Sequence, residues 1–495
     1  MKILFAASEA NPILKVGGIA DVVGSLGKEI KNSGHDLRII IPFYQTLKNR
    51  TDLNKISSFT IRMGGNWETV EIFQTLLPGH IETANIPVYL LKNDRYLSDR
   101  GVYLENQEFF HLARFLFFSK AVTEIFENID WVPEIIHCHD WQAGTIPLFL
   151  KIKGRKRAET RKIKTLFTIH NLLTQGCWDF SSVLKFLELK GTETTSLSER
   201  SPGPYGDNFN VIQQAILNAD LINTVSPSYG REIKTKTYYA RGLDKIIQKR
   251  KQDIFGIING IDTELFDPAT DKCVKKNYSF KTINLKGIDK TDLQKETGLE
   301  EKSDPLLAVV SRLDIQKGID LIYQSIDRII RKGAQMIFLG EGQKKYESML
   351  QQVAKKYPKQ IAVYIKFDPD LAQKIYAGAD IFLMPSRFEP CGLSQLIAMR
   401  YGTIPVVRKT GGLADTVENM RFATRINPFK KRIRGTGFVF EKYSPQDFMV
   451  GINRAIDTYH QKGLWQQLQK NAMKKDFSWK QSAKKYLKLY SKITF

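Results

Sequence analysis

The chain has 495 residues, 42% hydrophobic and 25% charged, a composition typical of globular proteins that excludes a disordered or collagen-like chain. Because single hydrophobic cores stop growing near ~250–300 residues, this length predicts two domains. Lys and Arg number 74 against 52 Asp and Glu, and the resulting formal charge of +22 favours anionic partners, although lysine-rich solvated faces would give the same total.

The sequence argues against a membrane span, disulfide bonds, a structural zinc site and nucleic-acid binding. No apolar run reaches the ~20 residues that a bilayer requires, and the short N-terminal run ends at Ser8 and Glu9, unlike a signal peptide. The four cysteines contain no Cys-x-x-Cys pair, which argues against disulfides and structural zinc and predicts a cytoplasmic protein. The basic stretches 151–164 and 421–434 look like surface loops and accompany no nucleic-acid-binding motif. We expect neither a membrane nor a nucleic-acid partner.

Short apolar runs alternate with amphipathic stretches along the chain, the pattern of an α/β protein with parallel sheets. The predicted strands are 2–6, 37–41, 135–138, 164–169 and 221–225, then a second series at 255–258, 306–310, 335–339, 361–365, 381–384 and 404–407. Helical patterns lie between them, for example at 19–31, 319–331 and 371–376. We therefore predict two doubly wound domains, 1–250 with a C-terminal helix at about 477–495, and 251–476.

The turn after the first predicted strand contains Lys15, Gly17 and Gly18 and precedes a helix. Two glycines let backbone N–H groups approach a ligand, and Lys15 adds a charge suited to phosphate, although the turn could also simply join strand to helix. It is neither a Walker A loop nor a G-x-G-x-x-G fingerprint, which disfavours ATPases and dehydrogenases. Residues 15–23 are echoed at 409–417, which indicates two similar halves.

Two further turns in the second half carry charge. Arg312 and Lys317 follow the predicted strand 306–310, and Glu389 follows 381–384 just before a helix predicted at 393–400. Ligands of open α/β sheets bind at the carboxyl ends of such strands, where two cations could clamp a pyrophosphate and a carboxylate could meet a sugar. A solvated pair of cations and a buried acid satisfied by loop amides are the structural alternatives.

Histidines cluster in His137-Cys-His139-Asp140 and recur at His170, in each case after a predicted strand. We expect His137 and His139 to point to opposite sides if the strand continues through them. No Glu or Cys completes a ligand set, so we predict no metal site and favour polar contacts to a sugar.

Seven motifs occur in one order and together resemble the bacterial and plastid glycogen/starch synthases. They are KVGGIADVV, HCHDWQAG, TIHN, GIINGID, SRLDIQKG, PSRFEPCGL and YGTIPVVRKTGGLADTV, and they span residues 15–417. The resemblance implies a GT-B fold, with two Rossmann-like domains facing an interdomain cleft. It also implies retaining transfer of glucose from ADP-glucose to an α-glucan such as glycogen or a maltooligosaccharide, with no cofactor.

The resemblance also implies roles for individual residues. Those expected at the catalytic centre are Glu389, His170, Arg312 and Lys317, and those expected to contact substrate are Lys15, Gly17, Gly18, Asp21, Asp140, Asn259, Phe367, Cys391, Gly392, Leu393 and Ser394. Arg312 and Lys317 would hold the pyrophosphate with the amides of Leu393 and Ser394. Phe367 stands where the bacterial enzymes often have a tyrosine that stacks on adenine.

Three departures from the family pattern lie in the N-terminal half. Gln142 replaces a common histidine, Thr174 replaces a frequent aromatic residue, and residues 210–215 differ from the usual run, so acceptor preference is the property in doubt. Two alternatives stay open: a related transferase that uses UDP-glucose or another acceptor, and a non-catalytic protein that binds glucan or nucleic acid. A phosphorylase is disfavoured because we find no Schiff-base lysine motif for pyridoxal phosphate.

Overall fold

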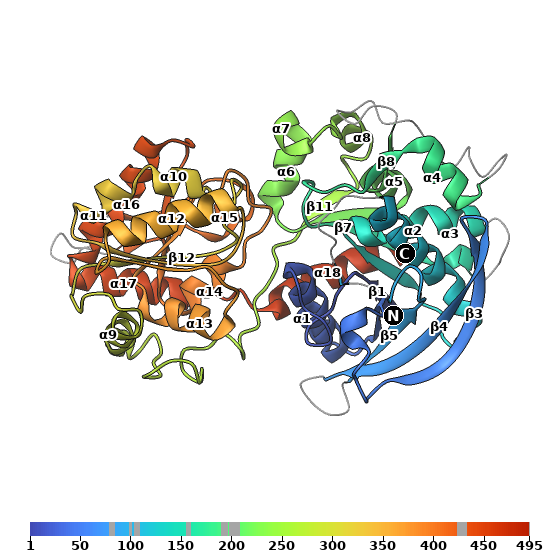
Figure 1. The fold of residues 1–495 in the computed structure, drawn as a ribbon, viewed down its shortest axis with the longest axis horizontal. Coiled ribbons are helices and arrows are strands. Elements are labelled where there is room, and N and C mark those ends of the chain that lie inside the picture. The colour runs from blue at the N-terminus through green and yellow to red at the C-terminus, as the bar shows by residue number, and fades with distance from the viewer. Residues whose placement is uncertain are drawn as a thin grey trace. The chain divides into compact units, whose positions relative to one another are not determined.

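The structure is a computed structural model, and it describes residues 1–78, 85–98, 101–102, 109–154, 160–189, 197, 208–422 and 433–494. The basic stretches 151–164 and 421–434 lie partly outside the described residues. The chain divides into two compact units. Unit 1 comprises Met1–Gly260 and Trp479–Phe495, and unit 2 comprises Ile261–Ser478 (Figure 1).

Unit 1 contains a nine-stranded sheet in the order β11-β10-β7-β6-β1-β2-β5-β4-β3. Its strands are β1 (Lys2–Ala6), β2 (Asp36–Pro42), β3 (Asn54–Met63), β4 (Asn66–Leu77), β5 (Ile86–Lys92), β6 (Ile135–His139), β7 (Lys164–Ile169), β10 (Leu221–Thr224) and β11 (Ile254–Gly256). The strands from β11 to β5 are parallel, and β4 and β3 extend the sheet as antiparallel partners. A short antiparallel pair, β8 (Cys177–Asp179) and β9 (Asn208–Asn210), is separate.

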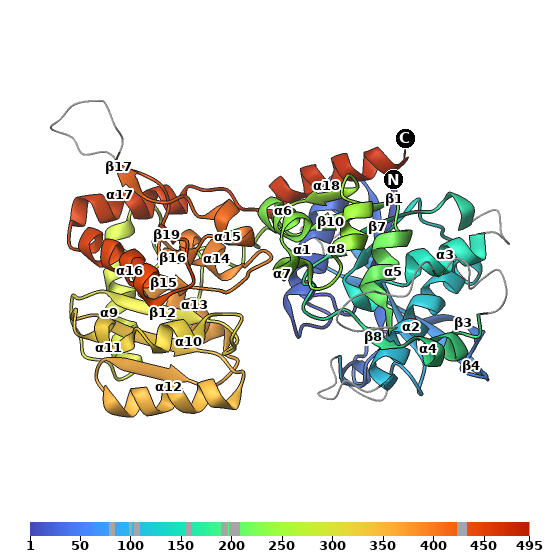
Figure 2. The same cartoon turned by 90° about the horizontal axis from the view of Figure 1, so that it is seen from above.

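Both faces of the parallel part of this sheet are buried, which explains why most of its parallel strands read as apolar runs. The helices of unit 1 are α1 (Gly18–Asn32), α2 (Phe109–Glu124), α3 (Ile146–Gly154), α4 (Phe180–Leu187), α5 (Val211–Asn218), α6 (Pro227–Thr235), α7 (Thr237–Ala240), α8 (Asp244–Lys249) and α18 (Trp479–Thr494). Successive side chains alternate between faces, so Phe5 belongs to the hydrophobic cluster that includes α1 and α18, while Leu4 belongs to the cluster that includes α2, α3 and α5. Figure 2 shows α18, in red, among the blue and green elements of unit 1.

One predicted strand belongs to a different sheet from the one we expected. The run at 255–258 was predicted to open the second series, but the strand there is β11, and it pairs in parallel with β10. Ile222 lies opposite Ile254 in that register, so β11 forms the edge of the unit 1 sheet. The prediction was wrong because an apolar run identifies a strand but not its neighbour.

Unit 2 contains a six-stranded parallel sheet in the order β14-β13-β12-β15-β16-β19. Its strands are β12 (Leu306–Val310), β13 (Gln335–Leu339), β14 (Ile361–Tyr364), β15 (Ile381–Met384), β16 (Ile404–Arg408) and β19 (Phe438–Phe440). In chain order these are 3-2-1-4-5-6, the order of the doubly wound dinucleotide-binding fold. A short pair, β17 (Arg421–Phe422) and β18 (Ile433–Arg434), lies outside the sheet.

Helices surround this second sheet and share one large core with it. They are α9 (Lys286–Glu296), α10 (Ile319–Tyr323), α11 (Ile326–Ile330), α12 (Lys344–Lys356), α13 (Pro369–Gly378), α14 (Ser394–Arg400), α15 (Gly411–Thr416), α16 (Pro445–Tyr459) and α17 (Lys462–Met473). The single helix predicted at 319–331 is therefore two helices. At the break, the Ser325 hydroxyl donates to the Leu321 carbonyl at 2.9 Å, the local side-chain bond that bends helices.

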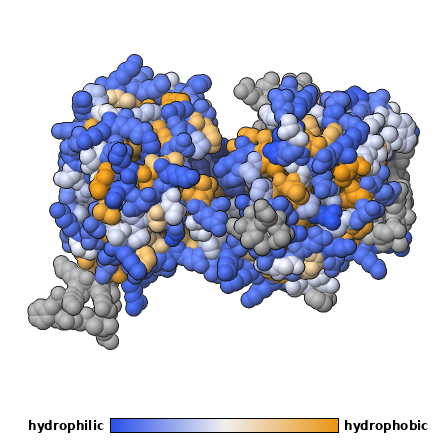
Figure 3. Space-filling view, turned by 90° about the horizontal axis from the view of Figure 1, so that it is seen from below, coloured by the Kyte–Doolittle hydropathy of each residue, from blue (hydrophilic) through white to orange (hydrophobic). Residues whose placement is uncertain are grey.

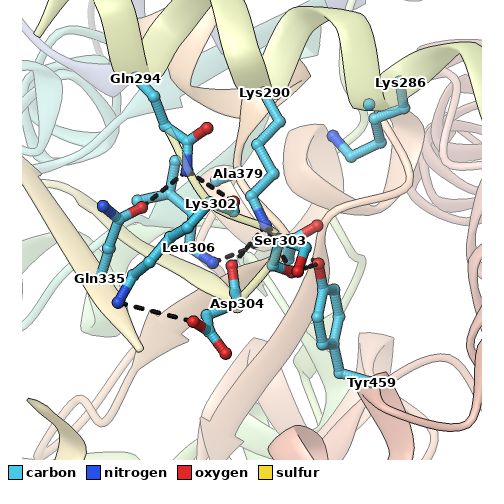
Figure 4. Close-up of polar contacts among 12 residues, drawn as sticks. Lys286, Lys290, Gln294, Lys302, Ser303, Asp304, Leu306, Gln335, Ala379 and Tyr459 are labelled. Atoms are coloured by element: carbon cyan, nitrogen blue, oxygen red, sulfur yellow. Dashed lines mark hydrogen bonds and ion pairs between the residues drawn. The ribbon is translucent and has the colours of Figure 1, made fainter. Parts of the chain in front are cut away.

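A buried ion pair ties α9 to the sheet of unit 2. Lys290 Nζ lies 2.7 Å from Asp380 Oδ2, and the two side chains are only 8% and 11% exposed. Lys290 also donates to the Tyr459 hydroxyl at 2.9 Å, and the same Asp380 oxygen accepts from the Leu306 amide at 2.9 Å. Figure 4 shows Lys290 pointing from α9 toward Ser303 and Tyr459. The pair thus joins the starts of β12 and β15 to a covering helix.

We expect Asp380→Asn to lower the free energy of unfolding by about 3–5 kcal/mol, because it leaves the Lys290 charge buried without its partner. The matched control is Asp327→Asn, since Asp327 pairs with Lys356 at 3.1 Å while both side chains are more than half exposed. That change should cost at most about 1 kcal/mol. Urea unfolding of both variants checks the expectation, which equal losses would contradict.

Candidate active site

The strand order reverses at one point in each sheet, between β1 and β6 in unit 1 and between β12 and β15 in unit 2. Open α/β sheets bind ligands beyond the carboxyl ends of strands at such a switch point. Lys15 and Asp140 follow β1 and β6, and Arg312 and Glu389 follow β12 and β15. The topology therefore collects predicted site residues at the switch point of each unit.

The turn after β1 is organised by a residue that sequence reasoning did not select. Glu9 is fully buried, and its Oε2 accepts from the amides of Val16 at 2.6 Å and Gly17 at 2.8 Å. The Gly17 amide is therefore occupied within the chain. Lys15 Nζ lies 2.8 Å from Asp21 Oδ1, so two predicted substrate-binding residues form an ion pair. The sequence does contain a signal for this role, because Glu9 is a carboxylate only three residues after the apolar strand β1.

Gly18 opens helix α1 and has open space around it. Among the described residues, no heavy atom lies within 4 Å of the position that a Cβ on Gly18 would occupy. Packing within unit 1 therefore does not require glycine at this position.

The histidines of β6 stack on one face of the strand. We expected His137 and His139 to point to opposite sides, but their ring centroids are 4.0 Å apart. That expectation was wrong because side chains alternate with period two, so residues i and i+2 share a face. His139 Nδ1 also lies 3.2 Å from Nε2 of His170, which follows β7.

Burial keeps these rings neutral. It lowers the pKa of His137 and His139 well below the usual value, with neighbouring imidazoles contributing, and lowers the pKa of His170 to about 3. Within the described part of the chain, no group of three or more His, Cys, Asp or Glu side chains is arranged to hold a metal ion.

Asp140 sits on a strained backbone directly after β6. Its φ is 59° and its ψ is −174°, a combination that residues with a Cβ rarely adopt. Its side chain is buried, and Oδ1 has no hydrogen-bond partner in the described part of the chain. Burial raises its pKa to about 7, opposed by amide hydrogen bonds from His170, Trp141 and Asn171. Strain and an unpaired buried carboxylate oxygen mark a position whose side chain serves something other than packing.

We expect Asp140→Asn to gain stability relative to the parent protein as pH rises. Because the pKa of Asp140 is about 7 when folded and 3.8 ordinarily, the folded state binds more protons between those values, and its stability falls as pH rises through that window. The amide does not titrate. The free energy of unfolding of Asp140→Asn minus that of the parent protein should therefore increase between about pH 5 and about pH 8. Urea unfolding at both pH values measures the shift, and a constant difference would contradict the assignment.

A buried ion pair joins the two charged turns of unit 2. Lys317 Nζ lies 2.7 Å from Glu389 Oε2, with the side chains 16% and 6% exposed, and the Ser386 hydroxyl donates to the same oxygen at 3.0 Å. These residues follow β12 and β15, which are neighbours in the sheet. The structure therefore brings together two predicted catalytic residues that are 72 positions apart.

Backbone contacts hold the two turns in register. The Arg387 amide donates to the Gln316 carbonyl at 2.8 Å, and the Lys317 amide donates to Asp314 Oδ1 at 3.0 Å. Arg312, in contrast, has a side chain that is 63% exposed, and it contacts Asp314 at 3.1 Å and Gln316 at 3.3 Å. The turn thus fixes one cation in a buried pair and leaves the other at the surface.

The second Gly-Gly turn supports the loop that carries Glu389. Gly411 has a φ of +43°, and a Cβ there would overlap the Glu389 carbonyl oxygen. A Cβ on Gly412 would overlap the Cys391 carbonyl oxygen and lie 2.5 Å from the Cys391 Cα. Gly392, with a φ of +74°, precedes α14. Gly411 and Gly412 are therefore required by the packing of this loop, whereas Gly18 in the first copy of the motif is not. The sequence analysis did not predict this difference.

The remaining predicted residues lie at the edges of these groups. Leu393 and Ser394 form the start of α14, and Ser394 Oγ donates to the Val310 carbonyl at 3.4 Å. Phe367 follows β14 and is 74% exposed, which leaves its ring accessible for stacking. Asn259 in unit 1 is buried, and its Oδ1 has no hydrogen-bond partner among the described residues.

Comparisons with known proteins decide the family. The starch synthase catalytic domain family matches residues 2–249, and the glycosyl transferases group 1 family matches residues 289–475. A glycogen synthase of Moorella thermoacetica is 42% identical over 491 residues, covering 99% of this chain and 96% of that protein. The chain belongs to the glycogen synthase family. A glycogen synthase of Clostridium perfringens is also 42% identical, over 497 residues that cover 100% and 98% of the two chains.

Solved structures give the same result for this glycogen synthase family member. The catalytic domain of starch synthase IV from Arabidopsis thaliana, solved with ADP and acarbose, matches with a TM-score of 0.88 at 32% identity, covering 100% of this chain and 99% of that one. Sucrose-phosphate synthase from Thermosynechococcus elongatus matches with a TM-score of 0.60 at 16% identity over 99% and 98%, which shows the fold alone. The predicted GT-B fold and the predicted family are confirmed.

The surface and the helices add two observations. The face seen in Figure 3 is mostly hydrophilic, with hydrophobic side chains in scattered groups. Among the described residues, no helix is both long enough and apolar enough to cross a membrane.

Proposed function

We propose that this chain is a glycogen synthase that transfers glucose from ADP-glucose to the non-reducing end of an α-1,4-glucan, with retention at the anomeric carbon. Its family members are glycogen synthases, and the related starch synthase IV domain binds ADP and acarbose. A cytoplasmic location stays a prediction from the sequence.

The observation that carries the donor assignment is the Lys317–Glu389 pair at the switch point of unit 2. An ammonium has three donors, and the contact with Glu389 uses one of them, so Lys317 can also bind a phosphate oxygen. Arg312 supplies a fork of donors from an exposed side chain. The two cations would offset the charge that develops on departing ADP, with the amides of Leu393 and Ser394 assisting.

Glu389 would orient the sugar rather than attack it. Its Oε2 is held by both Lys317 and Ser386, and the ion pair neutralises its charge. Retaining hydrolases use a second carboxyl about 5 Å away as nucleophile, and the predicted site residues of unit 2 include no carboxyl besides Glu389. We therefore assign a front-face displacement in which an oxygen of the departing phosphate accepts the proton of the incoming hydroxyl.

Unit 1 would supply contacts to the sugar and the acceptor. His170 and Asn259 would lie around the transferred glucose, with the His170 carbonyl near its developing positive charge. Asp140 would meet sugar or acceptor hydroxyls, since it is buried and Oδ1 lacks a partner in the described part of the chain. Lys15, Gly17, Gly18 and Asp21 would lie near the phosphates and the acceptor.

Unit 2 would supply the remaining contacts to the donor. Phe367 would stack on adenine, and Cys391 and Gly392 would shape the glucose site.

The test is incorporation of labelled glucose into glycogen by the purified full-length protein. We expect incorporation from ADP-glucose, slower incorporation from UDP-glucose, and unchanged rates when a chelator is added. Faster transfer from UDP-glucose would overturn the donor assignment, and binding of glycogen or nucleic acid without transfer would overturn the enzymatic one.

A further inference from the structure

The side chain of His139 makes one hydrogen-bonding contact in the described part of the chain, and that contact is with His170. The ring of His139 is buried between the edge of Phe5 and the ring of His137, with centroids 5.1 Å and 4.0 Å away. Its Nδ1 lies 3.2 Å from His170 Nε2, and its Nε2 has no hydrogen-bond partner among the described residues. The mechanism proposed above uses His170 but gives His139 no role.

The contact requires one proton between the two facing nitrogens, and both rings are neutral. If His170 Nε2 carried that proton, His139 would hold its own proton on Nε2, where a buried N–H would have no acceptor. If His139 Nδ1 carries the proton, the unpartnered His139 Nε2 is unprotonated and leaves only a lone pair without a donor. Buried N–H groups without acceptors are rarer in proteins than acceptors without donors. The second arrangement is therefore favoured.

We propose that His139 is a positioning residue that fixes the tautomer of His170, with the His170 proton on Nδ1. His170 Nε2 accepts from His139, so Nδ1–H is left as a donor in a different direction on a half-buried ring. A sugar hydroxyl can accept that hydrogen bond, whereas the other tautomer would present a lone pair there. This inference rests on the proposed function, because it takes His170 to contact the transferred sugar.

The ring of His139 is itself held in place through His137. His137 Nδ1 lies 2.8 Å from the Tyr490 hydroxyl on α18, and its Nε2 lies 2.6 Å from Thr168 Oγ1 on β7. All three side chains are buried. The C-terminal helix therefore supports the ring against which His139 packs, and a fixed His139 can hold a fixed tautomer on His170.

The experiment is nitrogen NMR of the full-length enzyme labelled only at its seven histidines. We expect the His170 signals, assigned by their loss in His170→Gln, to show a protonated Nδ1 and an unprotonated Nε2. His139→Leu removes the donor and should mix the two tautomers, whereas His139→Asn keeps an N–H near the Nδ1 position and should preserve the parent pattern. The control is His111→Leu, since His111 contacts Phe115 and Trp141 rather than His170, and its loss should leave the His170 signals unchanged.

Kinetics provide the second readout. We expect kcat/KM for ADP-glucose to fall roughly fivefold to tenfold in His139→Leu, because the competent tautomer becomes a minority, and to recover in His139→Asn. A protonated Nε2 on His170 in the parent enzyme, or parent signals and rates in His139→Leu, would overturn the proposal. If the parent protein transfers no glucose while its His170 carries the Nδ1 proton, the proposed function fails and the tautomer assignment stands.

Discussion

Arg312→Ala and Lys317→Ala should each lower turnover with ADP-glucose by about 10²-fold or more, the effect of removing one positioned donor from a developing anion. The two substitutions should differ in their effect on the free energy of unfolding. Arg312 is 63% exposed, so its loss should leave the free energy of unfolding nearly unchanged. Lys317 is partly buried and pairs with the buried Glu389, so its loss also leaves a buried carboxylate without its counter-charge. Steady-state kinetics and urea unfolding of the same preparations separate the two effects.

A double variant tests whether Lys317 acts on the donor or only on Glu389. In Lys317→Met with Glu389→Gln, no unpaired charge remains, so the fold should recover. Turnover should nevertheless fall well below that of Glu389→Gln alone, which measures the loss of Glu389 itself. Lys344→Ala is the charge-matched control, because Lys344 lies in the same unit, is 91% exposed and pairs only with Glu347 among the described residues. A double variant as active as Glu389→Gln alone, or near-parental rates in both Arg312→Ala and Lys317→Ala, would refute a cationic clamp on the diphosphate.

Gly412→Ala and Gly18→Ala should have opposite consequences, although both residues are the second glycine of the same echoed turn. A methyl group on Gly412 would overlap the backbone of Cys391 and displace the loop that carries Glu389. We expect a loss of about 3 kcal/mol in the free energy of unfolding, the scale of overpacking a tight contact, and a lower turnover. Thermal or urea unfolding together with initial rates measures both quantities.

At Gly18 the added methyl group would enter open space, so the free energy of unfolding should stay within about 0.5 kcal/mol of the parent value. If substrate approaches the start of α1 closely, turnover should nevertheless fall, by up to roughly 10²-fold for a displacement on the order of 1 Å. Parental rates in Gly18→Ala would show that no substrate approaches this glycine closely. Equal destabilisation by the two substitutions would contradict the difference in packing.

The parallel strands were the most predictable part of the fold. The bounds predicted for β1, β7, β12, β13 and β15 agree with the structure, because each is an apolar run bounded by polar or turn residues. The hairpin of β3 and β4 was not predicted, since its strands mix polar and apolar residues at the edge of the sheet. The assignment of β11 failed for another reason, because its neighbour is decided by tertiary packing.

The candidate site was predictable in its residue types but not in its internal contacts. Motif positions selected Lys317 and Glu389, and the sheet order explains why they meet. The buried Glu9 beneath the first turn and the His139–His170 contact depend on side-chain directions that spacing alone did not supply. The wrong expectation for His137 and His139 has a different cause, because the period-two alternation of a strand already places residues i and i+2 on one face.

The most direct test of the account is a structure of the full-length protein with bound ADP. We predict that the diphosphate lies against Arg312 and Lys317, at the carboxyl ends of β12 and β15, with the adenine beside Phe367. A diphosphate bound elsewhere on the protein, with Lys317 still paired only to Glu389, would contradict it.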